Sequence, residues 1–268
     1  MSWGSLGAGA SLASKVETWA KDAVLEVQEY VRLIGKVARA VVTPPIYYRD
    51  IVEQFDSIGS GSLTVVLLAG LFTGMVLALN SGITLDQFGA RSMIGRLISA
   101  SMVKELGPVL TALMLTSRVG SAIAAELGSM VVAEQVAALR ALGSDPVRKL
   151  VVPRVLAGTM MAPVLTVISD LVGVVGGWVI AVFQLRVASS VYWTSVLEGL
   201  YPQDPWMGLI KPFFLGFAIV SIACHVGLRT SGGTQGVGRA VTSAVVAASV
   251  AVLAVDFFIT RLLISLLY

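Results

Sequence analysis

The sequence contains little charge. Only 13% of its 268 residues are Asp, Glu, Lys or Arg, whereas 56% are hydrophobic, and the mean hydropathy is +0.86. Soluble domains carry about 25% charged residues, so this composition excludes an ordinary soluble protein and predicts an integral membrane protein. The length suits one domain of several membrane-spanning helices.

Cysteine and histidine occur once each, as the neighbours Cys224 and His225. A single cysteine excludes an intrachain disulfide, and two adjacent residues make a poor metal site. The sequence has no GxxxxGK[ST] phosphate loop and no recognisable nucleophile elbow. We therefore predict a chain with no enzymatic activity, no metal and no cofactor of its own, and no nucleic-acid partner.

Long apolar segments dominate what is present. They cover residues 62–80, 98–125, 155–184, 208–228 and 240–267, and about 20 residues suffice to cross a bilayer. The predicted fold is all-α and integral to the membrane, with five transmembrane helices. The predicted division is an N-terminal segment at 1–55 and a five-span domain at 56–268.

The N-terminal segment carries an amphipathic pattern. Apolar residues recur every three or four positions over 13–41, with basic residues mostly between them. This pattern predicts a helix that lies in the membrane surface, and a soluble helix packed on a partner is the alternative. Pro44 and Pro45 are expected to end it.

Basic residues outside the spans are distributed unevenly. Most fall on the side of the N-terminus, and the opposite connectors hold only Arg91, Arg96 and Arg186. Because Lys and Arg concentrate in cytoplasmic loops, we predict a cytoplasmic N-terminus and an outside C-terminus.

A charged connector, "AEQVAALRALGSDPVRKLVVPR", fills residues 133–154. Val136, Leu139 and Leu142 recur at helical spacing, Gly143 can end that helix, and Ser144-Asp145-Pro146 can start the next. A short cytoplasmic helix of this kind either docks a soluble partner or packs against lipid headgroups. Composition leaves both open.

Several ionisable residues fall inside the predicted spans. Lys104, Glu105, Lys211 and Asp256 lie at compatible heights toward the outer side, and pairing offsets a cost of at least ~2–3 kcal/mol for each buried charge. Snorkelling is the alternative for the two lysines. Asp170 lies in the middle of its span without an obvious partner.

Four stretches resemble the MlaE/YrbE permease family, the membrane subunits of MCE-associated ABC lipid transporters. They are "GMVLAL" (74–79), "KELGPVLTALMLTSRVGSAIAAELGSM" (104–130), "EQVAALRALGSDPVRKLVVPR" (134–154) and "AVLAVDFFIT" (251–260). The resemblance covers nearly the whole chain from about residue 50. It implies five spans, a permease dimer in the bacterial cytoplasmic (inner) membrane, a separate cytoplasmic ATPase that uses ATP, a periplasmic ring of MCE proteins and a lipid substrate.

The resemblance also assigns residues. The connector matches the coupling helix of the family, with Glu134, Gln135, Leu139 and Arg140 expected to contact the ATPase. Lys104 stands where the family often has Arg, and Glu105, Lys211 and Asp256 match its other buried charges. The lipid path is expected at the dimer interface, along spans one, two and five, with Met75, Leu77, Leu79 and Asn80 facing lipid.

A function of another class remains open from the residues alone. Glu105, Asp170 and Asp256 could form a proton relay in an ion- or proton-coupled secondary carrier. An inverted internal repeat would favour that carrier, and we detect none. Lipid identity, the direction of transport, the exact partners and the choice between homodimer and heterodimer are not determined by the sequence.

Overall fold

The chain consists of two compact units. A computed structural model describes residues 5–43 and 47–267, and the chain divides into Met1–Ile46 and Tyr47–Tyr268. The expected boundary after residue 55 falls inside a helix that begins at Tyr48. The polar stretch "YYRDIVEQFDSIGSGS" (residues 47–62), which precedes the first long apolar segment, is therefore mostly the first turns of the first span.

The first unit contains one long helix, α1 (Ser5–Val42). Its apolar Val24, Val27 and Val31 are exposed, each by at least 60%. Exposed apolar side chains on a helix that also carries basic residues fit a position in a membrane surface, which stays a prediction. Pro44 and Pro45 lie outside the described residues.

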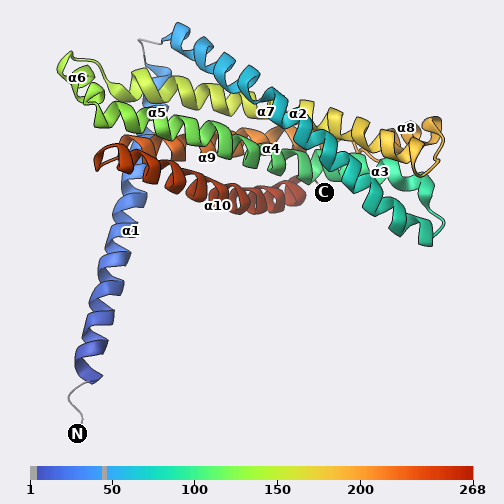
Figure 1. The fold of residues 1–268 in the computed structure, drawn as a ribbon, viewed down its shortest axis with the longest axis horizontal. Coiled ribbons are helices and arrows are strands. Elements are labelled where there is room, and N and C mark those ends of the chain that lie inside the picture. The colour runs from blue at the N-terminus through green and yellow to red at the C-terminus, as the bar shows by residue number, and fades with distance from the viewer. Residues whose placement is uncertain (1–4, 44–46, 268) are drawn as a thin grey trace. The chain divides into compact units, whose positions relative to one another are not determined.

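The second unit is a bundle of helices (Figure 1). Its elements are α2 (Tyr48–Gln87), η1 (Arg91–Met93), α3 (Ile94–Ser101), η2 (Met102–Leu106), α4 (Gly107–Leu115), η3 (Thr116–Gly120), α5 (Ser121–Val132), α6 (Gln135–Ala141), η4 (Val147–Val151), α7 (Val152–Phe183), α8 (Ser189–Glu198), α9 (Asp204–Leu228) and α10 (Gly233–Leu267). Within the described residues, five segments are long and apolar enough to cross a membrane, which confirms the expected five spans.

Glycines bring α2 and α7 into close contact. A Cβ atom on Gly74 would lie 1.8 Å from the carbonyl oxygen of Gly173, and one on Gly70 would lie 2.7 Å from that of Ser169. Only glycine permits backbones to approach this closely, as small residues do at helix interfaces in membranes. The two helices form one tightly packed pair.

The second membrane segment, Arg91–Val132, is not one regular helix. Two π-helical turns, η2 and η3, interrupt it and isolate α4 between them. π-Turns inside α-helices are rare and occur frequently at functional sites. Lys104 and Glu105 belong to the first of these turns and Arg118 to the second.

The short helices α6 and α8 lie at opposite ends of the bundle (Figure 1). At the α8 end, Tyr192 is fully buried and its hydroxyl donates a hydrogen bond to the Val174 carbonyl at 2.8 Å. Ser99 of α3 donates to the Val196 carbonyl at 3.1 Å. These contacts fix α8 against α3 and α7.

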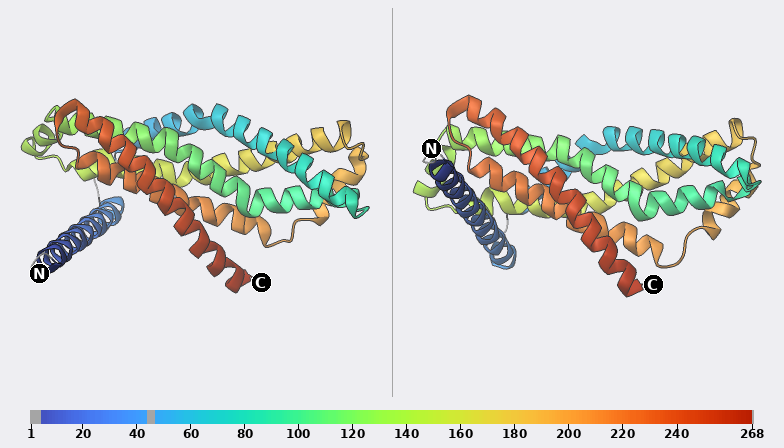
Figure 2. Two further views of the ribbon diagram at one scale, coloured as in Figure 1. Left: turned by 60° about the horizontal axis from the view of Figure 1, so that its bottom comes forward. Right: turned by 90° about the horizontal axis from the view of Figure 1, so that it is seen from below.

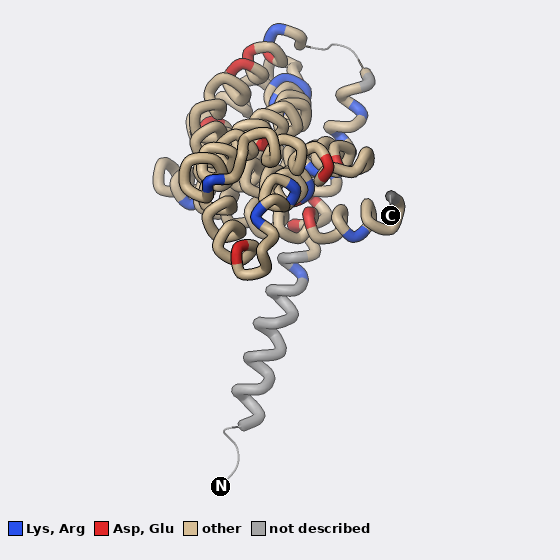
Figure 3. Tube along the Cα trace, turned by 90° about the vertical axis from the view of Figure 1, so that its right-hand side faces the viewer, with Lys and Arg blue, Asp and Glu red and all other residues tan. Residues whose placement is uncertain are grey.

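The last helix, α10, runs obliquely across the bundle, and its C-terminal part diverges from the other helices (Figure 2). Its alanines Ala244 and Ala248 are buried, whereas Val250, Leu253 and Phe257 are exposed. An end-on view shows acidic and basic positions scattered among helices that are otherwise uncharged (Figure 3). A large apolar face of α10 is thus left uncovered by the described part of this chain.

Candidate functional site

Lys211 is the centre of an ion-pair network that joins three membrane segments. Its side chain is fully buried, and its Nζ lies 2.8 Å from Oε1 of Glu105 and 3.6 Å from Oδ1 of Asp256. Glu105 belongs to η2, Lys211 to α9 and Asp256 to α10. Two carboxylates therefore face one buried ammonium.

The same ammonium also donates to the main-chain carbonyl of Lys104, at 2.7 Å. Pro108 follows four residues later and has no N–H, so this carbonyl lacks its α-helical donor. The local π-turn also has the Gly107 N–H bonded to the Met102 carbonyl. Lys211 thus satisfies a backbone acceptor that the sequence of α4 leaves open.

The side chain of Lys104 has a different partner from the one expected. Its Nζ lies 3.0 Å from Oδ1 of Asp204, which is fully buried at the start of α9, and 5.5 Å from the ring centre of Tyr201. Lys104 therefore contributes its carbonyl to the Lys211 network, and its ammonium forms a second pair. Asp204 was not predicted as a partner because it lies just before the predicted span 208–228. Its depth in the membrane nevertheless matches that of Lys104.

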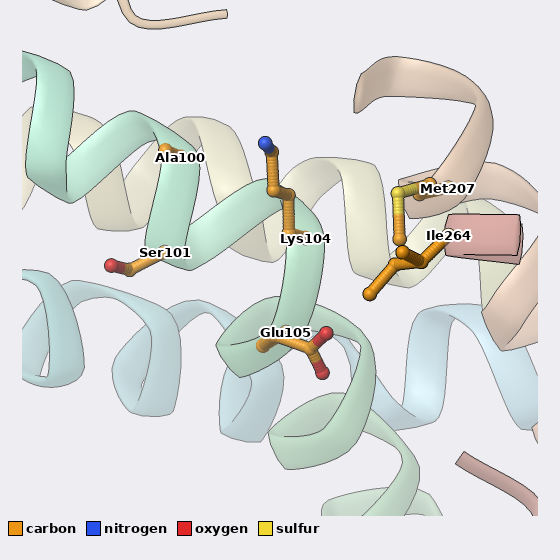
Figure 4. Close-up of a pocket in the computed structure, with 6 residues that line it drawn as sticks. All are labelled: Ala100, Ser101, Lys104, Glu105, Met207 and Ile264. Carbon is orange, nitrogen blue, oxygen red and sulfur yellow. The ribbon is translucent and has the colours of Figure 1, made fainter. Parts of the chain in front are cut away.

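A cavity of about 570 Å³ lies beside the network. Its lining residues come from α3, η2, α9 and α10 and are Ala100, Ser101, Lys104, Glu105, Met207 and Ile264. Lys104 and Glu105 project in different directions from the same turn, while Met207 and Ile264 supply apolar surface (Figure 4). The cavity combines a mainly apolar wall with one cation and one anion.

A second cavity, of about 350 Å³, opens along α2. It is lined by Phe72, Thr73, Val76, Leu77, Asn80 and Leu106. Of the four residues expected to face lipid, Leu77 and Asn80 are in this lining, and Met75 and Leu79 are half-buried elsewhere. Residues two positions apart on an α-helix point about 160° away from each other, so the four do not share one face.

Asp170 lies apart from the Lys211 network. It is buried in α7, and its Oδ1 packs against Gly107, where a Cβ atom would collide with it. Oδ1 accepts no hydrogen bond from the described residues. Of the three carboxylates considered for a proton relay, Glu105 and Asp256 thus share Lys211, and Asp170 packs against the start of α4.

The connector forms the expected short helix, α6. Leu139 is half-buried and Val136 is buried, whereas Glu134, Gln135 and Arg140 are exposed. The N–H groups of Gly143 and Ser144 bond to the carbonyls of Arg140 and Leu139, both at 3.0 Å, and Gly143 has a φ of 76°. This is a Schellman ending, so Gly143 ends the helix as predicted.

Glu134 precedes α6 in a left-handed conformation, with a φ of 59°. A residue other than glycine in this region is strained by on the order of 1 kcal/mol. The sharp turn lets the chain leave α5 and start α6 at once. Backbone strain is thus located at one of the residues expected to contact a partner.

Ion pairs link both sides of the connector to the bundle. Arg154 of α7 is buried, and its Nη2 lies 2.7 Å from Oε1 of Glu126 in α5. Lys149 lies 3.3 Å from Oδ2 of Asp50, at the start of α2. Lys149 and Arg154 belong to the charged connector of residues 133–154, and neither pair was predicted from the sequence.

Comparisons with known proteins agree with this architecture. The family model described as "Permease MlaE" matches residues 51–262. A probable ABC transporter permease protein of Rickettsia bellii is 43% identical over 223 residues, covering 83% of this chain and 86% of that protein. The intermembrane phospholipid transport system permease protein MlaE of Haemophilus influenzae is 36% identical over 214 residues, covering 80% and 82%.

A more distant relative comes from a plant. The protein TRIGALACTOSYLDIACYLGLYCEROL 1, chloroplastic, of Arabidopsis thaliana is 33% identical over 228 residues, covering 85% of this chain and 65% of that protein. The matched region in this chain contains all five membrane segments almost completely, from α2 to α10. This chain belongs to the MlaE permease family.

Proposed function

We propose that this chain is the permease subunit of an ABC transporter that moves phospholipids or related lipids between the cytoplasmic membrane and a periplasmic MCE protein. The observation that carries the proposal is the mainly apolar cavity that contains Lys104 and Glu105 beside the Lys211 network. A phospholipid has the matching chemistry, because a charged headgroup needs polar partners and its acyl chains need apolar walls.

The α2 cavity supports a path for acyl chains. Leu77 and Asn80 line it together with Leu106, which directly follows Glu105. The lipid path thus runs along Leu77 and Asn80 toward the charged turn of η2. Met75 and Leu79, on another face of α2, stay candidates for contact with lipid outside this cavity.

A second permease copy is the proposed cover for α10. Val250, Leu253 and Phe257 are each exposed by more than half. A contiguous apolar face of this kind suits another helix as well as lipid, and a dimer would enclose the lipid path.

The ATPase is proposed to dock on α6. Its exposed Glu134, Gln135 and Arg140 offer polar contacts, and Leu139 offers an apolar one. The pairs Arg154–Glu126 and Lys149–Asp50 connect the flanks of α6 to α5, α7 and α2. A displacement of α6 would therefore be passed to the spans. This assignment places the N-terminus in the cytoplasm and the C-terminus outside.

Reconstitution tests the proposal. The permease, with the ATPase and MCE protein encoded for the same transporter, is placed in vesicles that contain a fluorescent phospholipid. We expect lipid transfer to the MCE protein to require ATP, and we expect the ATPase to co-purify with the permease in a fixed ratio. The mass of the complex reports whether one or two permease chains are present.

Two results would contradict it. If no ATPase is retained by the permease, the ABC assignment fails. If a proton gradient drives transport without ATP, and a protonophore abolishes it, the secondary carrier with Glu105, Asp170 and Asp256 is the correct function.

A further inference from the structure

Arg118 is a cation in a membrane segment without a carboxylate partner among the described side chains. It lies in the π-turn η3 and is exposed, and its Nη1 donates to Oγ of Ser62 in α2 at 2.9 Å. By contrast, Lys104, Lys211 and Arg154 each pair with a carboxylate. A guanidinium has five N–H donors, and the bond to Ser62 uses one.

Gly61 provides the surface against which this guanidinium lies. A Cβ atom on Gly61 would be 2.4 Å from Nη2 of Arg118 and 2.9 Å from its Cζ. The Nη1/Nη2 end of the guanidinium thus lies against the bare backbone of α2, and the Ser62 hydroxyl accepts a hydrogen bond from Nη1. The cation is pre-positioned, which lowers the entropic cost of binding a ligand.

The contact lies at a boundary in polarity along α2. Residues 49–62 include Arg49, Asp50, Glu53 and Asp56, whereas 63–79 contain no charged residue. Ser62 is therefore the last residue before the apolar run. In a bilayer this boundary lies beside the headgroups, where the phosphates of lipids are found.

We propose that Arg118, seated on Gly61 and Ser62, binds the phosphate of a lipid headgroup at this boundary. The planar fork of a guanidinium matches two phosphate oxygens. The site is separate from the Lys104–Glu105 cavity, because the whole of α4 lies between η2 and η3. The proposal requires a membrane-spanning chain and does not depend on transport, so it can fail or hold independently of the proposed function.

Lipid titration of the purified permease tests the site. The full-length chain in detergent is titrated with phosphatidylglycerol, and the bound lipids are counted by native mass spectrometry. Arg118→Gln should weaken the tightest-binding lipid about tenfold, the loss of one charge-assisted contact. Arg118→Lys keeps the charge without the fork and should give a smaller loss.

Two glycine variants distinguish an effect on the Arg118 site from a general effect of adding a methyl group to α2. Gly61→Ala displaces the guanidinium from its position against α2 and should weaken lipid binding, as Arg118→Gln does. Gly59→Ala is the matched control, because its Cβ would meet only the flexible end of Met161, at 2.4 Å. It should leave lipid binding unchanged. The unfolding midpoint of each variant is measured alongside.

The remaining measurements decide the ligand. Diacylglycerol, which lacks phosphate, should not occupy the site, and its binding should not respond to Arg118→Gln. Displacement of the lipid by millimolar inorganic phosphate would identify free phosphate as the ligand and overturn a lipid site. Unchanged phosphatidylglycerol binding in both Arg118→Gln and Gly61→Ala would overturn the proposal. Loss of the dimer in Arg118→Gln, without a change in lipid binding, would also overturn the proposal. It would indicate that Arg118 pairs with a carboxylate of a second copy.

Discussion

The side-chain ammonium of Lys211 donates a hydrogen bond to the main-chain carbonyl of Lys104, at 2.7 Å. The two side chains then serve different carboxylates, with Glu105 and Asp256 on Lys211 and Asp204 on Lys104. Two cations of like charge are therefore kept in separate pairs. The Lys211 pair holds η2, α9 and α10 together.

Mutant cycles should reveal this partner choice. Lys211→Ala leaves Glu105 and Asp256 without their cation and should cost about 3–5 kcal/mol of unfolding free energy. In an Asp256→Ala background the cost of Lys211→Ala should fall by about 0.5–3 kcal/mol. The unfolding free energy of each variant is measured by denaturation in mixed micelles.

The control for these cycles is Lys104→Ala, which should be additive with Asp256→Ala to within about 0.5 kcal/mol and non-additive with Asp204→Ala. Strict additivity of Lys211→Ala with Asp256→Ala would show that this pair contributes no coupling energy.

Two substitutions at Glu134 distinguish the effect of its left-handed backbone conformation from the effect of its charge. Glu134→Gly should relieve the left-handed strain and raise the unfolding free energy by about 1 kcal/mol, yet weaken capture of the ATPase because the carboxylate is lost. Glu134→Lys should weaken capture further and leave membrane insertion intact. Pull-down of the ATPase measures both.

Arg186, with a φ of 57°, provides the matched control. Arg186→Gly relieves the same kind of strain in the connector between α7 and α8, and it should leave ATPase capture unchanged. Full capture by Glu134→Lys would argue against a coupling role for α6.

A photoreactive residue at position 77 should capture lipid in an ATP-dependent manner, because Leu77 lines the α2 cavity. The same residue at position 79 points to another face, so its crosslinking should not depend on ATP. Position 171, exposed on α7, reports bulk lipid. ATP-dependent capture of lipid at position 171 but not at position 77 would show that the lipid path lies on another face of the bundle.

Asp170→Asn keeps the size of the side chain and removes no observed ion pair, because no described cation lies within ion-pair distance of Asp170. Lipid transfer and stability should therefore stay near those of the unmodified protein, with a change below about 1 kcal/mol. Gly107→Ala, which places a methyl group against Oδ1 of Asp170, should be clearly destabilising. Loss of transport in a stable Asp170→Asn variant would support the proton relay.

The α2–α7 contact should tolerate no added atom at its centre. Gly74→Ala forces a methyl group against the Gly173 backbone and should lower the unfolding free energy by about 1–3 kcal/mol or more. Gly238→Ala in α10 has nothing within 4 Å and should stabilise by about 0.5–1 kcal/mol. Equal stabilities of the two variants would show that the two helices separate easily.

Local chemistry made much of this fold predictable. The five spans follow from apolar segments whose length matches a bilayer, and Gly143 ends α6 because glycine adopts a positive φ without strain. Both depend on neighbouring residues in the chain. The charged residues inside the spans were predictable as a set for the same reason, since they stand out from apolar neighbours.

Partner choice among those charges was decided by the tertiary structure. Asp204, rather than Asp256, faces Lys104 because the start of α9 packs beside η2, and the consecutive residues Lys104 and Glu105 project in different directions. The contact of Arg118 with Ser62 and that of Arg154 with Glu126 likewise join residues far apart in sequence. The sequence by itself determined which segments enter the membrane, because hydropathy is a sum over neighbours. Only packing decided which charges meet, because a rotation of one helix about its axis by a single residue, about 100°, replaces every contact on its face.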